Sequence, residues 1–290
     1  MPFITSYLTP LYLLSLVITA ISHLCYYSAF TPLSLINYTS PLEEVKIITT
    51  PISAFTSAST AMTSAAAIVV PAATKHTATF IFLHGLGDSG AGWSSVSENF
   101  RLRRKFDECS FIFPHAPMIP ISLNMGMRMP GWFDIVSLTD ILASEDETGI
   151  LGSARNIHAI IQEQINKGIA SERIILGGFS QGGALALLAG LTSEHKLGGI
   201  VGLSTWLPLH RNIESLVSEA NKKTDIFLAH GELDGVVRYR WGKLTEALLR
   251  DKLGHNVEWH SFPLLEHSAD PQEISDMEKW LHARLPPTSS

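Results

Sequence analysis

Apolar and polar positions follow two alternating patterns over most of the chain beyond residue 76. Short apolar runs, rich in β-branched and aromatic residues, are typical of buried strands, and they occupy residues 77–84, 110–113, 174–176, 199–203, 225–229 and 257–262. Helical spacing lies between them, up to about residue 104, over 148–168, after residue 180, near 211–221, over 239–253 and from residue 270 onward. Strands that alternate with helices predict one α/β domain, with a mostly parallel sheet covered by helices on both faces.

The first 75 residues differ in composition from the rest. No charged side chain precedes Glu43, and residues 11–30 are mostly apolar and numerous enough to cross a bilayer. A Ser/Thr/Ala/Pro-rich stretch, about 49–74, is typical of a linker. Three interpretations stay open: a membrane anchor, a cleaved signal peptide, or a dispensable segment before a start at Met62. We therefore predict an extension over residues 1–75 and an α/β catalytic domain over residues 76–286.

Charge and cysteine content argue against several function classes. The formal net charge is −6 and no basic block occurs, so nucleic acid is not an expected partner. The chain has only two cysteines, Cys25 and Cys109, and its twelve histidines lack metal-ligand spacing, so we expect neither a metal nor a cofactor. Residues 85–90 fit the dinucleotide pattern G-x-G-x-x-G, but the second strand ends in Phe-Pro-His at 113–115, without the acidic residue that would bind a ribose.

The strongest chemical signal is the spacing Gly178-x-Ser180-x-Gly182. The serine follows an apolar strand and precedes an Ala/Leu-rich helix, which is the context of a nucleophile elbow. We predict that Ser180 is the nucleophile and that the backbone N–H of Gln181 points to where an oxyanion forms. The glycine-rich loop after the first strand supplies a second donor, and the backbone N–H of Leu86 is the best candidate.

A nucleophile elbow requires an acid and a base, which follow the serine in that order along the chain. Both belong just beyond the carboxyl ends of later strands. Asp234 and His267 lie in such loops, and we predict them as acid and base. Glu232 is the rival acid, because the same loop carries it and the fold also admits glutamate.

Several motifs together resemble the acyl-protein thioesterase family of phospholipase/carboxylesterase type α/β-hydrolases. They occupy residues 84–90, 114–117, 124–127, 130–134, 177–183 and 204–209, and the resemblance covers 68–284. It implies an α/β-hydrolase fold, a Ser180–Asp234–His267 triad, an oxyanion hole at Leu86 and Gln181, and no cofactor. Glu232 departs from the family pattern, which usually has aspartate at that position.

The resemblance also implies what the enzyme acts on and where. It predicts removal of palmitoyl groups from S-acylated proteins, such as palmitoylated G-protein subunits, in the cytoplasm and also the nucleus. The first 61 residues have no counterpart in the family, so anchoring through residues 11–30 stays an alternative, and contact with a membrane surface would come through this segment or through the substrates. A carboxylesterase or lysophospholipase would use the same residues. A non-catalytic ligand-binding protein with this fold would be expected to lack one of the three predicted triad residues.

A fatty acyl chain requires an apolar groove. Leu123, Met125, Met127 and Met129 alternate along one loop, where flexible thioethers suit a variable tail, and Trp206 is a further candidate. Packing of these side chains against the core is the alternative interpretation.

Overall fold

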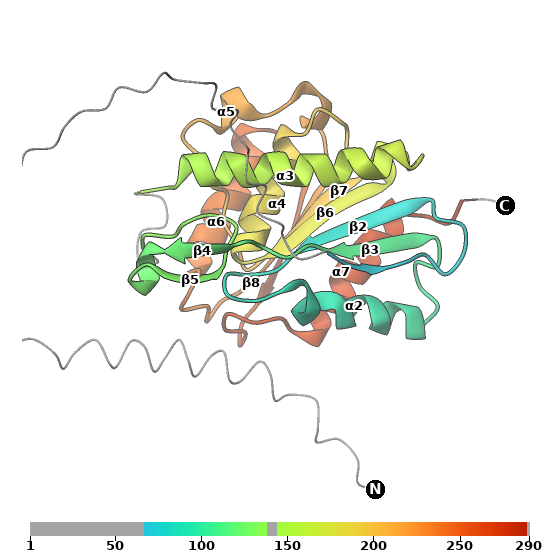
Figure 1. The fold of residues 1–290 in the computed structure, drawn as a ribbon, viewed down its shortest axis with the longest axis horizontal. Helices are drawn as coiled ribbons and strands as arrows, with labels where there is room; N and C mark the ends of the chain where they lie inside the picture. Colours follow the sequence, from blue (N-terminus) through green and yellow to red (C-terminus); the bar gives the residue numbers. More distant parts are fainter. Residues whose placement is uncertain (1–66, 138–143, 289–290) are drawn as a thin grey trace, which may run out of the picture. The chain divides into compact units, whose positions relative to one another are not determined.

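The computed structural model describes residues 67–137 and 144–288. Its centre is a seven-stranded sheet in the order β1-β3-β2-β6-β7-β8-β9 (Figure 1). The strands are β1 (Ile68–Val70), β2 (Ala78–Leu83), β3 (Cys109–Phe113), β6 (Ile174–Phe179), β7 (Gly199–Leu203), β8 (Ile226–Gly231) and β9 (Val257–Phe262). All neighbours run parallel except β1, which pairs antiparallel with β3 at one edge. The predicted α/β fold class is confirmed.

Helices cover both faces of this sheet. They are α2 (Gly90–Leu102), α3 (Glu147–Asn166), α4 (Gln181–Thr192), α5 (Ile213–Leu216), α6 (Tyr239–Ala247) and α7 (Pro271–Arg284). Side chains alternate across each strand, so Ile81 and Leu83 pack in the apolar cluster with α3 and α4. Phe80 and Phe82 pack in the opposite cluster with α2 and α7. Figure 1 shows α3 and α2 on opposite sides of the sheet.

The structure corrects some predicted boundaries. β1 (Ile68–Val70) pairs with β3 in the sheet, whereas the sequence predicts residues 1–75 as the extension, so the α/β domain includes residues from at least Ile68 onward. The predicted loop contains a hairpin of β4 (Met118–Ile121) and β5 (Met127–Pro130), joined through the 3₁₀ turn η1 (Ser122–Asn124).

Two predicted helices are shorter or irregular. The helix expected over 211–221 is the short α5, followed by the 3₁₀ turn η3 (Glu219–Asn221). The helix expected over 239–253 is α6, continued by a π-helical turn, η4 (Leu248–Lys252). A further 3₁₀ turn, η2 (Ser171–Arg173), precedes β6.

The predicted apolar span 11–30 and most of the predicted linker lie outside the described residues. Within 67–137 and 144–288, no helix has the length and apolar character needed to span a bilayer.

Candidate active site

Ser180 occupies a strained turn between β6 and α4. Its backbone has φ 55° and ψ −123°, a conformation that costs a non-glycine residue about 1–3 kcal/mol. A Cβ added at Gly178 would lie 2.4 Å from the backbone of Gly182, and one at Gly182 would lie 2.3 Å from the carbonyl oxygen of Leu83. Only glycine fits at these two positions, and together they allow the tight turn that presents the serine at the carboxyl edge of the sheet.

His267 contacts both other predicted triad residues. It lies in the loop after β9, and its Nε2 is 2.9 Å from Ser180 Oγ, while its Nδ1 is 2.7 Å from Asp234 Oδ2. A carboxylate only accepts hydrogen bonds, so we place the ring proton on Nδ1, which leaves Nε2 to accept from the serine hydroxyl. The Phe179 ring packs against the imidazole with centroids 4.7 Å apart.

Asp234 is buried and surrounded by donors. Its Oδ1 accepts from the backbone N–H groups of Val236 at 2.9 Å and Val237 at 2.8 Å, and its Oδ2 faces His267. Burial raises the pKa of the Asp234 carboxyl, but hydrogen bonds from His230 and His267 outweigh burial and lower the pKa to about 2. The rival acid Glu232 is exposed to solvent. Of the two, Asp234 is the one hydrogen-bonded to His267.

The loops that carry the acid and the base are joined through their backbones. Glu232 N–H donates to Phe262 O at 3.0 Å, and Leu233 N–H donates to Leu265 O at 3.1 Å. A side chain at Gly231 would lie 2.2 Å from Leu265 O, so this close approach requires glycine. The two loops therefore hold Asp234 and His267 in a fixed relation.

The loop that contains Leu86 approaches the serine from the other side. A Cβ on Gly85 would lie 3.4 Å from Ser180 Cβ. His84 is fully buried beneath this loop, where its Nδ1 donates to Gly85 O at 2.8 Å and its Nε2 accepts from Ala116 N at 3.1 Å. Burial lowers the pKa of His84, which fits a neutral ring that donates on one side and accepts on the other.

A second contact set fixes the Leu86 loop against the end of β5 and the residues that follow it. Trp132 Nε1 donates to His84 O at 2.8 Å, and Gly87 N donates to Pro130 O at 2.8 Å. The Gln181 side chain, whose contacts the sequence does not predict, accepts from Trp132 N at 3.0 Å and donates to Phe133 O at 2.6 Å. The Leu86 loop and Gln181, which are predicted to form the oxyanion hole, are thus both hydrogen-bonded to residues 130–133.

The predicted acyl-binding residues fall into two groups. Leu123, Met125 and Met127 are 41%, 76% and 50% exposed on the β4–β5 hairpin, and Met129 is half-buried near Gly87. Their packing against the core, which the sequence left open, is not found for the three exposed residues. Trp206 is separate from the hairpin and is buried.

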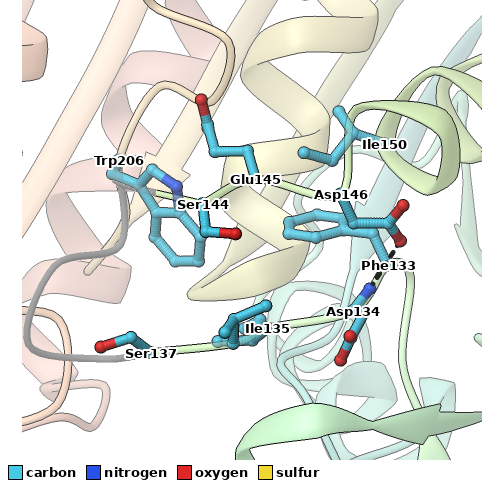
Figure 2. A pocket seen from close by; sticks show the side chains of 10 residues that line it. Phe133, Asp134, Ile135, Ser137, Ser144, Glu145, Asp146, Ile150 and Trp206 are labelled. Carbon is cyan, nitrogen blue, oxygen red and sulfur yellow. Dashed lines mark hydrogen bonds between the residues drawn. The ribbon is translucent and has the colours of Figure 1, made fainter.

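Trp206 lines a small pocket near the elbow (Figure 2). The neighbouring Thr205 donates to Ser180 O at 2.8 Å, which places the pocket beside the nucleophile turn. Phe133, Ile135 and Ile150 contribute apolar walls. Figure 2 shows the hydrogen bond from the Asp134 N–H to Asp146 Oδ2, 3.0 Å long, that borders it.

A serine on an elbow, hydrogen-bonded through histidine to a buried aspartate at the carboxyl edge of a parallel sheet, defines the class of serine hydrolases with the α/β-hydrolase fold. The sequence model of the phospholipase/carboxylesterase family matches residues 64–285, and the chain belongs to this family. It is therefore a hydrolase.

Relatives and solved structures agree with this assignment. An acyl-protein thioesterase 1 from Gibberella zeae is 52% identical over 228 residues, covering 77% of this chain and 97% of that protein. Acyl-protein thioesterase 1 from Emericella nidulans is 48% identical over 231 residues, with 77% and 97% covered. The crystal structure of Zea mays acyl-protein thioesterase 2 is 31% identical with a TM-score of 0.68, covering 76% of this chain and 98% of that chain.

Proposed function

We propose that this protein hydrolyses the thioester that joins a fatty acyl group to a protein cysteine. The observation that carries the proposal is the continuous contact from Ser180 Oγ through His267 to Asp234 Oδ2, at 2.9 and 2.7 Å. The names of the relatives at 48–52% identity support an S-acylated protein as substrate.

The chemistry follows from the positions of the groups. His267 Nε2 takes the Ser180 proton while Oγ attacks the thioester carbonyl, and Asp234 stabilises the imidazolium that forms. The backbone N–H groups of Leu86 and Gln181 are proposed to bind the oxyanion. A cysteine thiolate is a good leaving group because the pKa of free cysteine is about 8.5. Water then attacks the acyl-enzyme with His267 as base again.

The acyl group itself is proposed to be palmitoyl. The exposed apolar side chains of the hairpin, Leu123, Met125 and Met127, are 41%, 76% and 50% exposed and offer adaptable contacts to a flexible chain. Met129 extends the proposed acyl-binding surface toward the Leu86 loop, whereas Trp206 is buried and lines the separate small pocket near the elbow. Palmitoylated G-protein subunits are proposed as one class of protein substrate.

We further propose that the enzyme works in the cytoplasm and the nucleus, where its acylated substrates would be reached. Anchoring through residues 11–30 would keep it at a membrane instead. The N-glycosylation sequon Asn37-Tyr38-Thr39 would be glycosylated if the chain after residues 11–30 entered the lumen. Fractionation of cells with the full chain should give a soluble protein that endoglycosidase does not alter, whereas a glycosylated membrane species would contradict the cytoplasmic location.

Substitution of the nucleophile tests the proposed reaction. The full chain should release acyl groups from an S-acylated protein and react with a fluorophosphonate probe, and Ser180→Ala should lose both. Labelling that persists in Ser180→Ala would place the nucleophile elsewhere.

A comparison of kcat/KM among substrates tests the proposed substrate class. The family description also fits a carboxylesterase or lysophospholipase. The full chain should therefore be offered an S-acylated protein, a lysophospholipid and a short ester in parallel. A higher kcat/KM on the acylated protein supports the thioesterase, and a higher value on either other substrate overturns it.

A further inference from the structure

A second histidine contacts the acid of the triad. His230 lies within β8, four residues before Asp234, and its ring is 1% exposed. His230 Nε2 is 2.7 Å from the carbonyl oxygen of Val237 and 3.4 Å from Asp234 Oδ2. The same carboxylate oxygen is the one that faces His267. Asp234 Oδ2 therefore has an imidazole nitrogen on two sides.

The contacts of His230 define where its proton lies. Carbonyl and carboxylate oxygens only accept hydrogen bonds, so an Nε2 that faces both must carry a hydrogen. One N–H is thus shared between Val237 O and Asp234 Oδ2. Val237 N–H also donates to Asp234 Oδ1. His230 therefore contacts both the carboxylate of Asp234 and the backbone of the residue that binds the other carboxylate oxygen.

The surroundings leave the His230 ring little freedom. The Trp259 ring is stacked on it at 6.2 Å with an interplanar angle of 20°, and the Tyr239 ring meets it edge-on at 5.9 Å. A Cβ on Gly242 would lie 2.4 Å from His230 Nδ1, so the backbone of α6 lies directly against the imidazole. The ring is therefore held in one orientation before substrate binds.

We propose that His230 is a positioning residue for Asp234. It holds the carboxylate so that Oδ2 faces His267 and Oδ1 faces the two backbone donors, and it touches neither substrate nor Ser180. No proton is transferred from it. This inference rests on the proposed hydrolase function, since it assigns His230 a role only through the acid of that triad.

Two substitutions distinguish a hydrogen-bond donor role of His230 from a role in packing alone. His230→Gln keeps an N–H that can reach the Val237 carbonyl and Asp234, and His230→Met fills a similar volume without a donor. We expect His230→Met to lower kcat by about tenfold to a hundredfold, by analogy with the loss seen when a hydrogen-bond partner that orients a metal ligand is removed. KM should stay within about twofold, because the ring makes no contact with substrate. His230→Gln should recover most of the lost kcat.

His255 provides a matched control. It is 3% exposed and its Nδ1 is 3.1 Å from Thr224 O, but it precedes β9 and so lies at the opposite edge of the sheet from the triad. His255→Met and His255→Gln should reduce thermal stability without a specific loss of kcat. Equal kcat values for His230→Met and His230→Gln, or a loss no greater than that of His255→Met, would overturn the positioning role.

A measurement on the unmodified protein covers the case in which His230→Met does not fold. Nitrogen-15 NMR of the imidazole rings should show His230 with its proton on Nε2. A His230 ring protonated only on Nδ1 would overturn the proposal. Activity of the unmodified chain and its loss in Ser180→Ala are measured alongside. If the unmodified chain hydrolyses nothing, the proposed function fails, whereas the NMR result still decides whether His230 donates to the acid loop.

Discussion

The acid and base loops and the β4–β5 hairpin are built in opposite ways. In the loops, Asp234 is buried and accepts hydrogen bonds on both oxygens, and the two loops are joined through backbone hydrogen bonds. In the hairpin, four cross-strand residue pairs join β4 and β5, and apolar side chains are exposed on the strands and on the turn between them. Figure 1 shows this ribbon outside the main sheet. Polar partners thus fix the positions of the acid and the base, whereas the surface proposed for substrate recognition is left adaptable.

The largest expected effect comes from the acid. Asp234→Asn should lower kcat by about 10⁴-fold, as in protease triads, because an amide no longer holds the histidine proton on Nδ1. Glu232→Gln, an exposed position in the same loop, should leave kcat within about threefold of the unmodified enzyme. Steady-state kinetics on one thioester decide the matter. A larger loss in Glu232→Gln than in Asp234→Asn would show that the acid is assigned to the wrong residue.

A buried carboxyl on α7 lacks the hydrogen-bond donors that surround Asp234, and its pKa shifts in the opposite direction. Glu273 is fully buried, its Oε2 accepts weakly from Asp270 N at 3.4 Å, and its Oε1 has no hydrogen-bond partner among the described residues. Burial raises the pKa of the Glu273 carboxyl to about 8, helped by the charges of Asp270 and Asp234. Burial alone thus does not set the pKa; the low pKa of Asp234 results from its donors.

Glu273→Gln should therefore stabilise the protein at alkaline pH. Between pH 4.5 and about 8 the folded carboxyl keeps a proton that the unfolded chain releases, so the free energy of unfolding falls as pH rises through that window. Each pKa unit is worth about 1.4 kcal/mol, so the variant should gain a few kcal/mol at pH 8 and almost nothing at pH 4.5.

Urea unfolding at pH 5, 6.5 and 8 measures this difference. Glu232→Gln serves as the control, since it makes the same chemical change at an exposed position. A stability difference between Glu273→Gln and the unmodified protein that is the same at all three pH values would contradict the raised pKa.

The smallest effect on folding is expected in the hairpin. Met125 is 76% exposed, so Met125→Ser should change the free energy of unfolding by no more than about 0.5 kcal/mol. Under the proposed function it should raise KM for a palmitoyl thioester by a few-fold and leave KM for a short acyl thioester unchanged. Leu102→Ser, at an 83% exposed apolar position on α2, is the matched control. An equal change in KM for the palmitoyl and the short acyl thioester would contradict a role of the hairpin in binding the acyl chain.

Elements with a strong local signal could be predicted from the sequence. The buried strands, the long helix α3 and the glycine-framed turn at Ser180 are found where the pattern placed them. The start of α7 also matches, with Asp270 as cap, proline at the first position and Glu273 completing the capping box. Each of these depends on neighbours within a few residues.

Elements decided by distant contacts were missed. β1 is three residues long, too short to show a period, and exists because it pairs with β3. The helix near 211–221 stops early, where Ser218 N–H donates to Leu191 O of α4. The contact of His230 with the acid was equally invisible, since the predicted strand ended at residue 229 and nothing in the sequence indicates that β8 continues through His230 and turns its ring toward Asp234.

The order of the triad residues along the chain has a consequence for synthesis. Ser180 is made 87 residues before His267, and Asp234 also precedes the histidine. Under the proposed mechanism, a nascent chain, or one cut short by a premature stop before His267, carries Ser180 without the base that activates it. We therefore expect an incomplete chain that lacks His267 to be inactive.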